Sequence, residues 1–143
     1  MDTSETYIEM CEKAEEIQAH DWKWDELWYD KFNQLIKHYN PLENIDRENR
    51  ADNRDYYWQQ SDNMVWLPRQ DQLQEMLRYY PKDKPSELIY GNLAVIFGDW
   101  LRMKKDLSIG HNPSMEQLWL CFLMETEYDK IWNGQDWIKD GRD

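Results

Sequence analysis

Apolar side chains recur every three or four residues in five separate stretches of this sequence. In the first, residues 4–19, they fall on one side of a helix and the acidic residues fall on the other. The same period returns in residues 25–39, 68–80, 86–101 and 113–122. This spacing predicts five amphipathic helices, and the least polar of them, residues 86–101, is expected at the centre of the core.

Two short segments follow a different pattern. Residues 64–67 are a brief apolar run that suits a strand. Near the end of the chain, Asn133-Gly134 stands between two short arms that carry apolar residues, which is the strongest local signal for a hairpin with a two-residue turn. The sequence therefore predicts an α+β fold that is predominantly helical, with about five helices, a small C-terminal β-hairpin and room for one further short strand.

The chain has 143 residues, a length typical of one domain, so residues 1–143 are predicted to form a single domain. Its nine tryptophans supply large apolar area for a core, although exposed rings would also suit a sugar-binding surface. Three that fall on predicted apolar faces and are expected in the core are Trp28, Trp100 and Trp119. Three that stand outside such faces and are candidates for exposure are Trp22, Trp24 and Trp58.

No motif in the sequence indicates catalysis or cofactor binding. The histidines His20, His38 and His111 lie far apart and lack the spacing of metal ligands, and the glycines are too dispersed for a phosphate-binding loop. Cys11 and Cys121 each fall within a helical apolar pattern and are expected to be buried free thiols. The sequence therefore predicts no catalytic residue, no metal site and no cofactor, and an enzyme is not expected.

One acidic group remains as an alternative site. Asp46, Asp52 and Asp55 lie in a polar segment and are the best candidates for a divalent-cation site in a small metal-dependent hydrolase. Arginines interleave with them, so a solvated loop with paired charges explains the same pattern.

The net charge of −12 argues against binding to nucleic acid or to anionic membranes and favours basic partners. No apolar run is long enough to cross a membrane, and the first residues lack the basic and apolar regions of a signal peptide. The sequence therefore predicts a cytoplasmic protein without a membrane partner.

The negative charge is unevenly distributed. The first thirty residues hold ten acids and two lysines, whereas the other 113 residues hold 19 acids and 15 bases. On one helix, a row of carboxylates from Glu5 to Glu16 would span roughly 16 Å, and no base is expected on its face. Such a row could occupy a basic groove that normally holds DNA or RNA, although any helix needs a solvated face and glutamate suits one. The candidate partner-binding residues are Glu5, Glu9, Glu12, Glu15, Glu16, Asp21, Asp25, Glu26 and Asp30.

Four blocks of the sequence are specific as strings, namely Tyr7–Gln18 (YIEMCEKAEEIQ), Val65–Met76 (VWLPRQDQLQEM), Ser114–Leu120 (SMEQLWL) and Lys130–Trp137 (KIWNGQDW). Together they resemble small proteins of unassigned function that phages and prophages of Gram-positive bacteria encode. They consist mainly of apolar helix faces and a hairpin, so the resemblance implies a shared scaffold and carries over no catalytic residue.

The resemblance also implies a setting. Small acidic phage proteins without catalytic motifs often block a host protein, as anti-CRISPR proteins do. The expected function is therefore a phage-encoded, protein-binding inhibitor of a host nucleic-acid-handling enzyme, for instance a CRISPR effector nuclease, in the bacterial cytoplasm. Two alternatives stay open, namely an accessory or structural phage protein that forms an oligomeric contact, and the metal-dependent hydrolase. The sequence does not define the oligomeric state.

Overall fold

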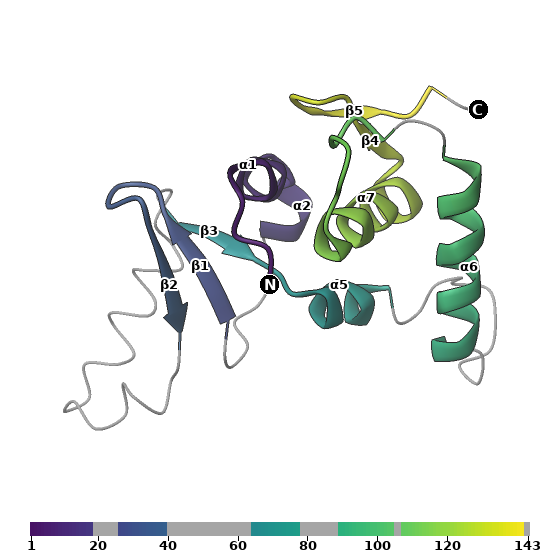
Figure 1. The fold of residues 1–143 in the computed structure, drawn as a ribbon, viewed down its shortest axis with the longest axis horizontal. Helices are drawn as coiled ribbons and strands as arrows, with labels where there is room; N and C mark the ends of the chain where they lie inside the picture. The colour runs from purple at the N-terminus through teal and green to yellow at the C-terminus, as the bar shows by residue number, and fades with distance from the viewer. Residues whose placement is uncertain (19–25, 40–63, 78–88, 105–106, 142–143) are drawn as a thin grey trace. The chain divides into compact units, whose positions relative to one another are not determined.

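The computed structural model of the chain describes residues 1–18, 26–39, 64–77, 89–104 and 107–141 (Figure 1). The chain divides into two compact units. The N-terminal unit is Thr3–Pro68, and the C-terminal unit is Met1–Asp2 with Arg69–Asp143. The described residues form five helices, a three-stranded sheet and a two-stranded hairpin, which confirms the predicted α+β class. The single domain expected from the length stays a prediction.

Helices α1 (Glu5–Lys13) and α2 (Glu15–Gln18) open the N-terminal unit. Ser4 caps α1, because its side-chain oxygen accepts a hydrogen bond of 3.2 Å from the backbone N–H of Tyr7. The apolar face that the sequence predicts is fully buried, at Tyr7, Met10, Cys11, Ala14 and Ile17. One helix was expected here, but Ala14 leaves the helical conformation, at φ −88° and ψ 73°, and separates two.

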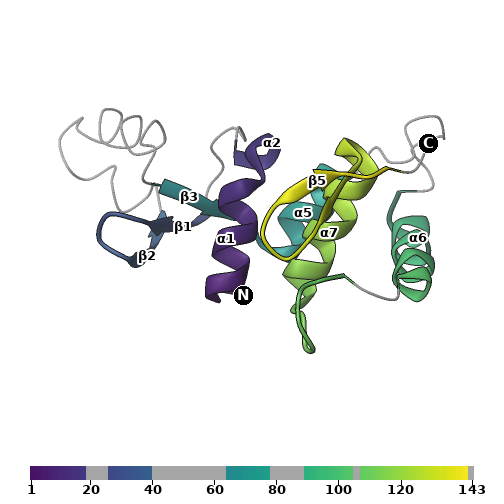
Figure 2. The ribbon, with the colours of Figure 1, turned by 90° about the horizontal axis from the view of Figure 1, so that it is seen from above.

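The sheet of the N-terminal unit contains β1 (Glu26–Asp30), β2 (Leu35–Tyr39) and β3 (Met64–Leu67). The strand order is β2-β1-β3, and both pairings are antiparallel. The strand predicted over residues 64–67 is confirmed. Helix α1 packs against β3, as Figure 2 also shows.

The helix predicted over residues 25–39 is wrong, because this segment forms β1, β2 and the turn between them. Trp28 lies opposite Trp66 in the ladder between β1 and β3 and is buried there. Phe32, which the helix would have buried, stands in the turn with 80% of its surface exposed. Pairing with a strand distant in sequence decides this segment, and local periodicity does not report such pairing.

The side chain of Gln18 joins α2 to β3. Its amide nitrogen donates to the backbone oxygens of Cys11 at 2.9 Å and Trp66 at 3.1 Å, and its amide oxygen accepts from the backbone N–H of Trp66 at 2.8 Å. Gln18 thus satisfies both backbone groups of Trp66 on the side of β3 away from β1. Tyr7 adds a second link, because its hydroxyl donates to the backbone oxygen of Pro68 at 2.6 Å.

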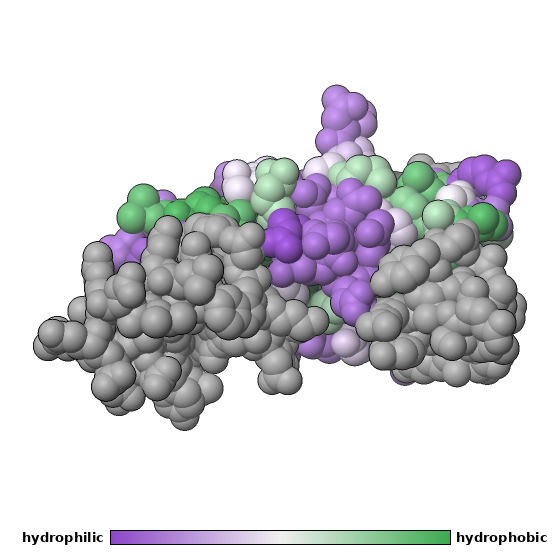
Figure 3. Space-filling model, turned by 90° about the horizontal axis from the view of Figure 1, so that it is seen from below, coloured by the Kyte–Doolittle hydropathy of each residue, from purple (hydrophilic) through white to green (hydrophobic). Residues whose placement is uncertain are grey.

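The C-terminal unit contains α5 (Gln70–Met76), α6 (Ile89–Met103), α7 (Met115–Tyr128) and a hairpin of β4 (Lys130–Trp132) and β5 (Trp137–Lys139). Figures 1 and 2 show α7 between the hairpin and α5, which both contact it. Figure 3 shows hydrophilic residues over α5. This agrees with the burial of α5, in which Leu73 is the one fully buried residue.

The core of the C-terminal unit is built around α7. Its residues from Gln117 to Met124 are all buried, whereas α6, the helix expected to be central, exposes Val95 and Met103. The two helices meet through aromatic rings. The ring centroid of Phe122 lies 5.3 Å from that of Trp100, 5.5 Å from that of Phe97 and 5.8 Å from that of Trp119. The prediction that tryptophans on apolar faces belong to the core holds for Trp28 and Trp119, while Trp100 is half-buried.

The predicted C-terminal hairpin is confirmed, but its turn is longer than expected. Trp132 pairs with Trp137, so four residues form the loop instead of two. The side-chain oxygen of Asn133 accepts from the backbone N–H groups of Gln135 at 2.9 Å and Asp136 at 2.8 Å. Gly134 supplies the positive φ, at 102°, that the loop needs.

Candidate acidic interface

The nine acids predicted to bind a partner differ in how far the structure exposes them. Glu5 and Glu12 on α1 and Glu15 on α2 are exposed, and Glu9 and Glu16 are half-buried. Asp30 is buried at the end of β1. Asp21 and Asp25 lie outside the described residues, and Glu26 is described only as the first residue of β1.

The acids of α1 share one side of the helix. Glu5, Glu9 and Glu12 are spaced by four and three residues, opposite the buried face that carries Tyr7 and Met10. The continuous row expected from Glu5 to Glu16 is wrong, because the helix ends before Ala14. The row within α1 is shorter, roughly 10 Å from Glu5 to Glu12 at the rise of an α-helix. We call Glu5, Glu9 and Glu12 the acidic face.

Two lysines lie beside the acidic face, which contradicts the expectation that no base interrupts it. The Lys13 ammonium lies 3.1 Å from a carboxylate oxygen of Glu9, one turn earlier on the helix. The Lys31 ammonium, from the turn after β1, lies 2.8 Å from a carboxylate oxygen of Glu12. All four side chains are between 35% and 45% exposed, so each pair contributes little to stability and can exchange partners readily.

Asp30 serves the fold and is not part of the acidic face. One of its oxygens accepts from the backbone N–H groups of Phe32 at 3.0 Å and Asn33 at 3.2 Å. The other accepts from the Asn33 amide and lies 2.8 Å from the Lys37 ammonium. Hydrogen bonds from Lys37 and Asn33 hold the pKa of Asp30 well below its ordinary value of 3.8. The Asp30 carboxylate is therefore already paired inside the protein and offers little exposed surface to a partner.

The Asp30 carboxylate makes a testable contribution to pH stability. Because its pKa is lowered by folding, its stabilising effect is present above the ordinary value of 3.8 and is lost as the pH falls below it. We expect Asp30→Asn to unfold at a lower urea concentration than the wild type at neutral pH, and the difference to shrink in acid. Glu5→Gln, the same change at an exposed site, is the control. A difference for Asp30→Asn that is constant with pH would contradict this account.

Sequence reasoning missed a cavity in the C-terminal unit. Lys104, Cys121 and Glu125 line it, and the Lys104 ammonium lies 2.6 Å from a carboxylate oxygen of Glu125. The spacing of Cys121 and Glu125, one helical turn apart, was a signal that both lie on one side of α7. Lys104 follows the end of another helix, so its approach to Glu125 depends on tertiary packing.

The part of the chain that the structure describes contains no group of three His, Cys, Asp or Glu side chains arranged to hold a metal ion. Asp46, Asp52 and Asp55, the candidates for a hydrolase site, lie outside that part.

Among the described helices, none is long and apolar enough to span a membrane. Cys11 and Cys121 are both buried thiols, as expected. Comparisons with protein-family models, curated proteins and solved structures find no match for this chain.

Proposed function

We propose that this protein is a non-enzymatic binding protein that inhibits a nucleic-acid-handling defence enzyme of a bacterial host. In this proposal it is phage-encoded and of the anti-CRISPR type, and it places the acidic face of α1 in the basic groove where the enzyme binds nucleic acid. The observation that carries the proposal is that Glu5, Glu9 and Glu12 lie together on one helix face, with Glu5 and Glu12 exposed and Glu9 half-buried.

The ion pairs beside the acidic face fit such a role. Glu9 and Glu12 keep 45% and 42% of their side-chain surface exposed although each is paired with a lysine. Exposed pairs are worth only about 0–1 kcal/mol, so a basic groove could replace Lys13 and Lys31 at little cost. The carboxylates would then meet the arginines and lysines that otherwise hold phosphates, and electrostatic attraction would speed the encounter.

The rigidity of the surface also supports binding. The opposite face of α1 is fully buried, and Ser4 caps its first turn. Helix α1 is therefore held in place before a partner arrives, and less conformational entropy is lost on binding.

Charge reversal tests the proposal. We expect the wild-type protein to inhibit DNA cleavage by at least one member of a panel of RNA-guided nucleases from Gram-positive bacteria. The triple variant Glu5→Lys, Glu9→Lys, Glu12→Lys should weaken that inhibition at least 100-fold, on the order of 3 kcal/mol for three contacts. Inhibition by the wild type should also weaken as salt is added. Cleavage assays at several salt concentrations measure both effects.

A matched control separates the acidic face from net charge. The variant Asp71→Lys, Asp99→Lys, Glu127→Lys makes the same change of charge on helices of the C-terminal unit. It should inhibit as the wild type does, and circular dichroism should show both variants folded. Equal loss in the two variants, or no nuclease inhibited by the wild type, would refute the proposal.

A second candidate, an accessory or structural protein that makes an oligomeric contact, is favoured by a separate observation. The turn after β1 and the start of β2 expose Phe32, Leu35 and Ile36, with exposed fractions of 80%, 56% and 39%. Light scattering that shows a stable oligomer, together with no inhibition of any nuclease, would favour this candidate over the first.

A further inference from the structure

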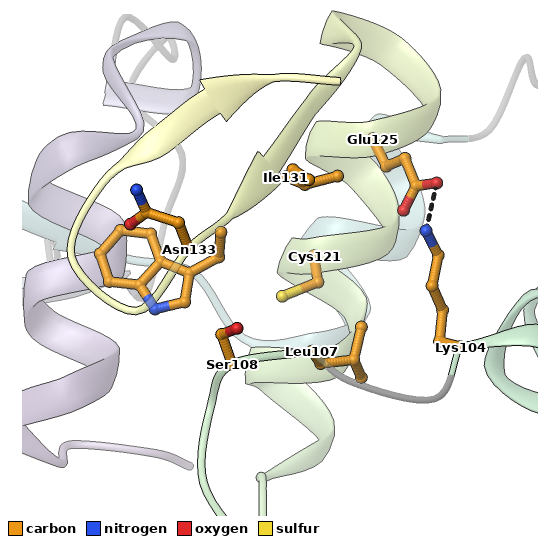
Figure 4. Close-up of a pocket in the computed structure, with 8 residues that line it drawn as sticks. Lys104, Leu107, Ser108, Cys121, Glu125, Ile131 and Asn133 are labelled. Carbon is orange, nitrogen blue, oxygen red and sulfur yellow. Dashed lines mark hydrogen bonds and ion pairs between the residues drawn. The ribbon is translucent and has the colours of Figure 1, made fainter. Parts of the chain in front are cut away.

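The C-terminal unit contains a cavity of about 220 Å³ between α7, the hairpin and the segment that follows α6. Cys121 and Glu125 enter it from α7, Ile131 and Trp132 from β4, and Asn133 from the hairpin loop. Figure 4 shows Lys104 and Glu125 on one side of the cavity and Asn133 on the other. Leu107, Ser108 and Cys121 lie between these ends in the same view.

The Lys104–Glu125 pair makes one end of the cavity polar but electrically neutral. The side chains are only 17% and 13% exposed, and the ammonium lies 2.6 Å from a carboxylate oxygen. The other carboxylate oxygen of Glu125 accepts a hydrogen bond of 2.8 Å from the indole nitrogen of Trp100. Lys104 also lies over the Trp100 ring, 5.8 Å from its centroid. These contacts fix the pair in place and leave the ammonium further N–H donors.

A neutral pair of this kind disfavours a charged ligand. An anion would be attracted by the Lys104 ammonium but repelled by the Glu125 carboxylate. A cation would be attracted by Glu125 but repelled by Lys104. Because a net charge placed beside this largely buried pair would lose water without gaining a counter-ion of its own, an uncharged ligand is preferred. It can still accept a hydrogen bond from Lys104.

Three of the other side chains that line the cavity suit an apolar ring, and Ser108 adds a hydroxyl beside them. Leu107, Ile131 and the indole of Trp132 supply apolar surface. Burial, together with the nearby Glu125 carboxylate, raises the pKa of the Cys121 thiol to about 12, so the thiol is neutral near neutral pH and is a poor nucleophile. The cavity is therefore equipped to bind a molecule and not to react with it through Cys121.

The size of the cavity limits the ligand. An apolar cavity of about 150 Å³ holds one benzene ring, so about 220 Å³ leaves space for a ring and a small substituent. At the end opposite Lys104, the Asn133 side-chain oxygen is already taken by the loop backbone. We propose that this cavity is a binding site for an uncharged, single-ring aromatic molecule that carries one hydrogen-bonding substituent, such as an amide. This site does not depend on the acidic face.

Three probes of nearly equal shape test the proposal, namely benzamide, benzoate and benzamidine, which are neutral, anionic and cationic. The readout is the chemical shift of the indole N–H of Trp132, which lines the cavity, followed by NMR. The indole N–H of Trp66, which is buried in the N-terminal unit, serves as an internal control. We expect benzamide to shift the Trp132 signal saturably and to leave the Trp66 signal unchanged. Benzoate and benzamidine should need at least tenfold higher concentrations for the same shift.

A cavity-filling variant completes the test. Leu107→Phe places a larger side chain in the lining and should weaken benzamide binding at least tenfold. Ile138→Phe adds the same ring at an exposed position of β5 that does not line the cavity, and should bind as the wild type does. The indole N–H signal of Trp132 in NMR reports both folding and binding in each variant. No saturable shift of the Trp132 signal, an equal shift of the Trp66 signal, or tighter binding of a charged probe would overturn the proposal.

Discussion

Phe122→Ala is expected to destabilise the C-terminal unit by about 3–5 kcal/mol, the usual loss when a buried phenylalanine is truncated. Phe122 is only 1% exposed, and its ring contacts those of Phe97, Trp100 and Trp119. The substitution removes the transfer free energy of the ring, leaves a cavity, and loses the edge-to-face contacts that aromatic rings prefer. Urea denaturation followed by tryptophan fluorescence would measure the loss.

The chain offers a matched control for this prediction. Phe32→Ala makes the same chemical change at a side chain that is 80% exposed, and should change the free energy of unfolding by less than about 0.5 kcal/mol. Similar losses for the two variants would mean that the aromatic cluster around Phe122 is not the core of its unit.

Gln18→Leu is the second substitution with a large expected effect, a loss of about 2–3 kcal/mol in the N-terminal unit. Leucine keeps the approximate size of the side chain but removes three hydrogen bonds, two of them to the backbone of Trp66. Trp66 is 1% exposed, so its backbone N–H and oxygen would have little access to water in the variant. Thermal and urea unfolding would measure the effect.

The same substitution at Gln74 is the control for Gln18→Leu. Gln74 lies on α5, and its side chain makes no hydrogen bond within the described residues. Gln74→Leu should change stability by less than about 0.5 kcal/mol. The hydrogen bonds of Gln18 would be unimportant if Gln18→Leu were equally well tolerated.

Local sequence patterns predicted the elements that bury either a regularly spaced set of apolar residues or a continuous apolar run. The apolar period of the first stretch identified five buried positions, three in α1 together with Ala14 and Ile17, and four consecutive apolar residues identified β3. The patterns failed where pairing with a distant segment decides the structure. The residues of β1 and β2 fit a helical period, but Trp28 pairs with Trp66 and Asp30 closes a turn. The turn of the C-terminal hairpin was mispredicted at a local level, because the Asn133 side chain accepts hydrogen bonds from two backbone N–H groups within a loop of four residues.

The candidate interface was predicted only in part, because some of its contacts come from segments that are distant in the sequence. Helical spacing placed Glu5, Glu9 and Glu12 on the exposed side of α1, and the structure places them there. The pairing of Lys31 with Glu12 could not be foreseen, because Lys31 lies in a turn that exists only once β1 and β2 have formed. Burial of Asp30 depends on the same turn. The cavity brings together residues from α7, the hairpin and the segment after α6, and no local pattern reports such a meeting.

The paired tryptophans of the C-terminal hairpin give this protein an optical property. The indoles of Trp132 and Trp137 face each other across the ladder, with ring centroids 5.2 Å apart and planes inclined at 57°. At this separation and angle their electronic transitions couple, and coupled chromophores in a chiral arrangement produce a paired positive and negative band in circular dichroism. That band depends on closure of a single four-residue loop, so its loss on heating would follow the opening of the hairpin separately from the melting of the helices.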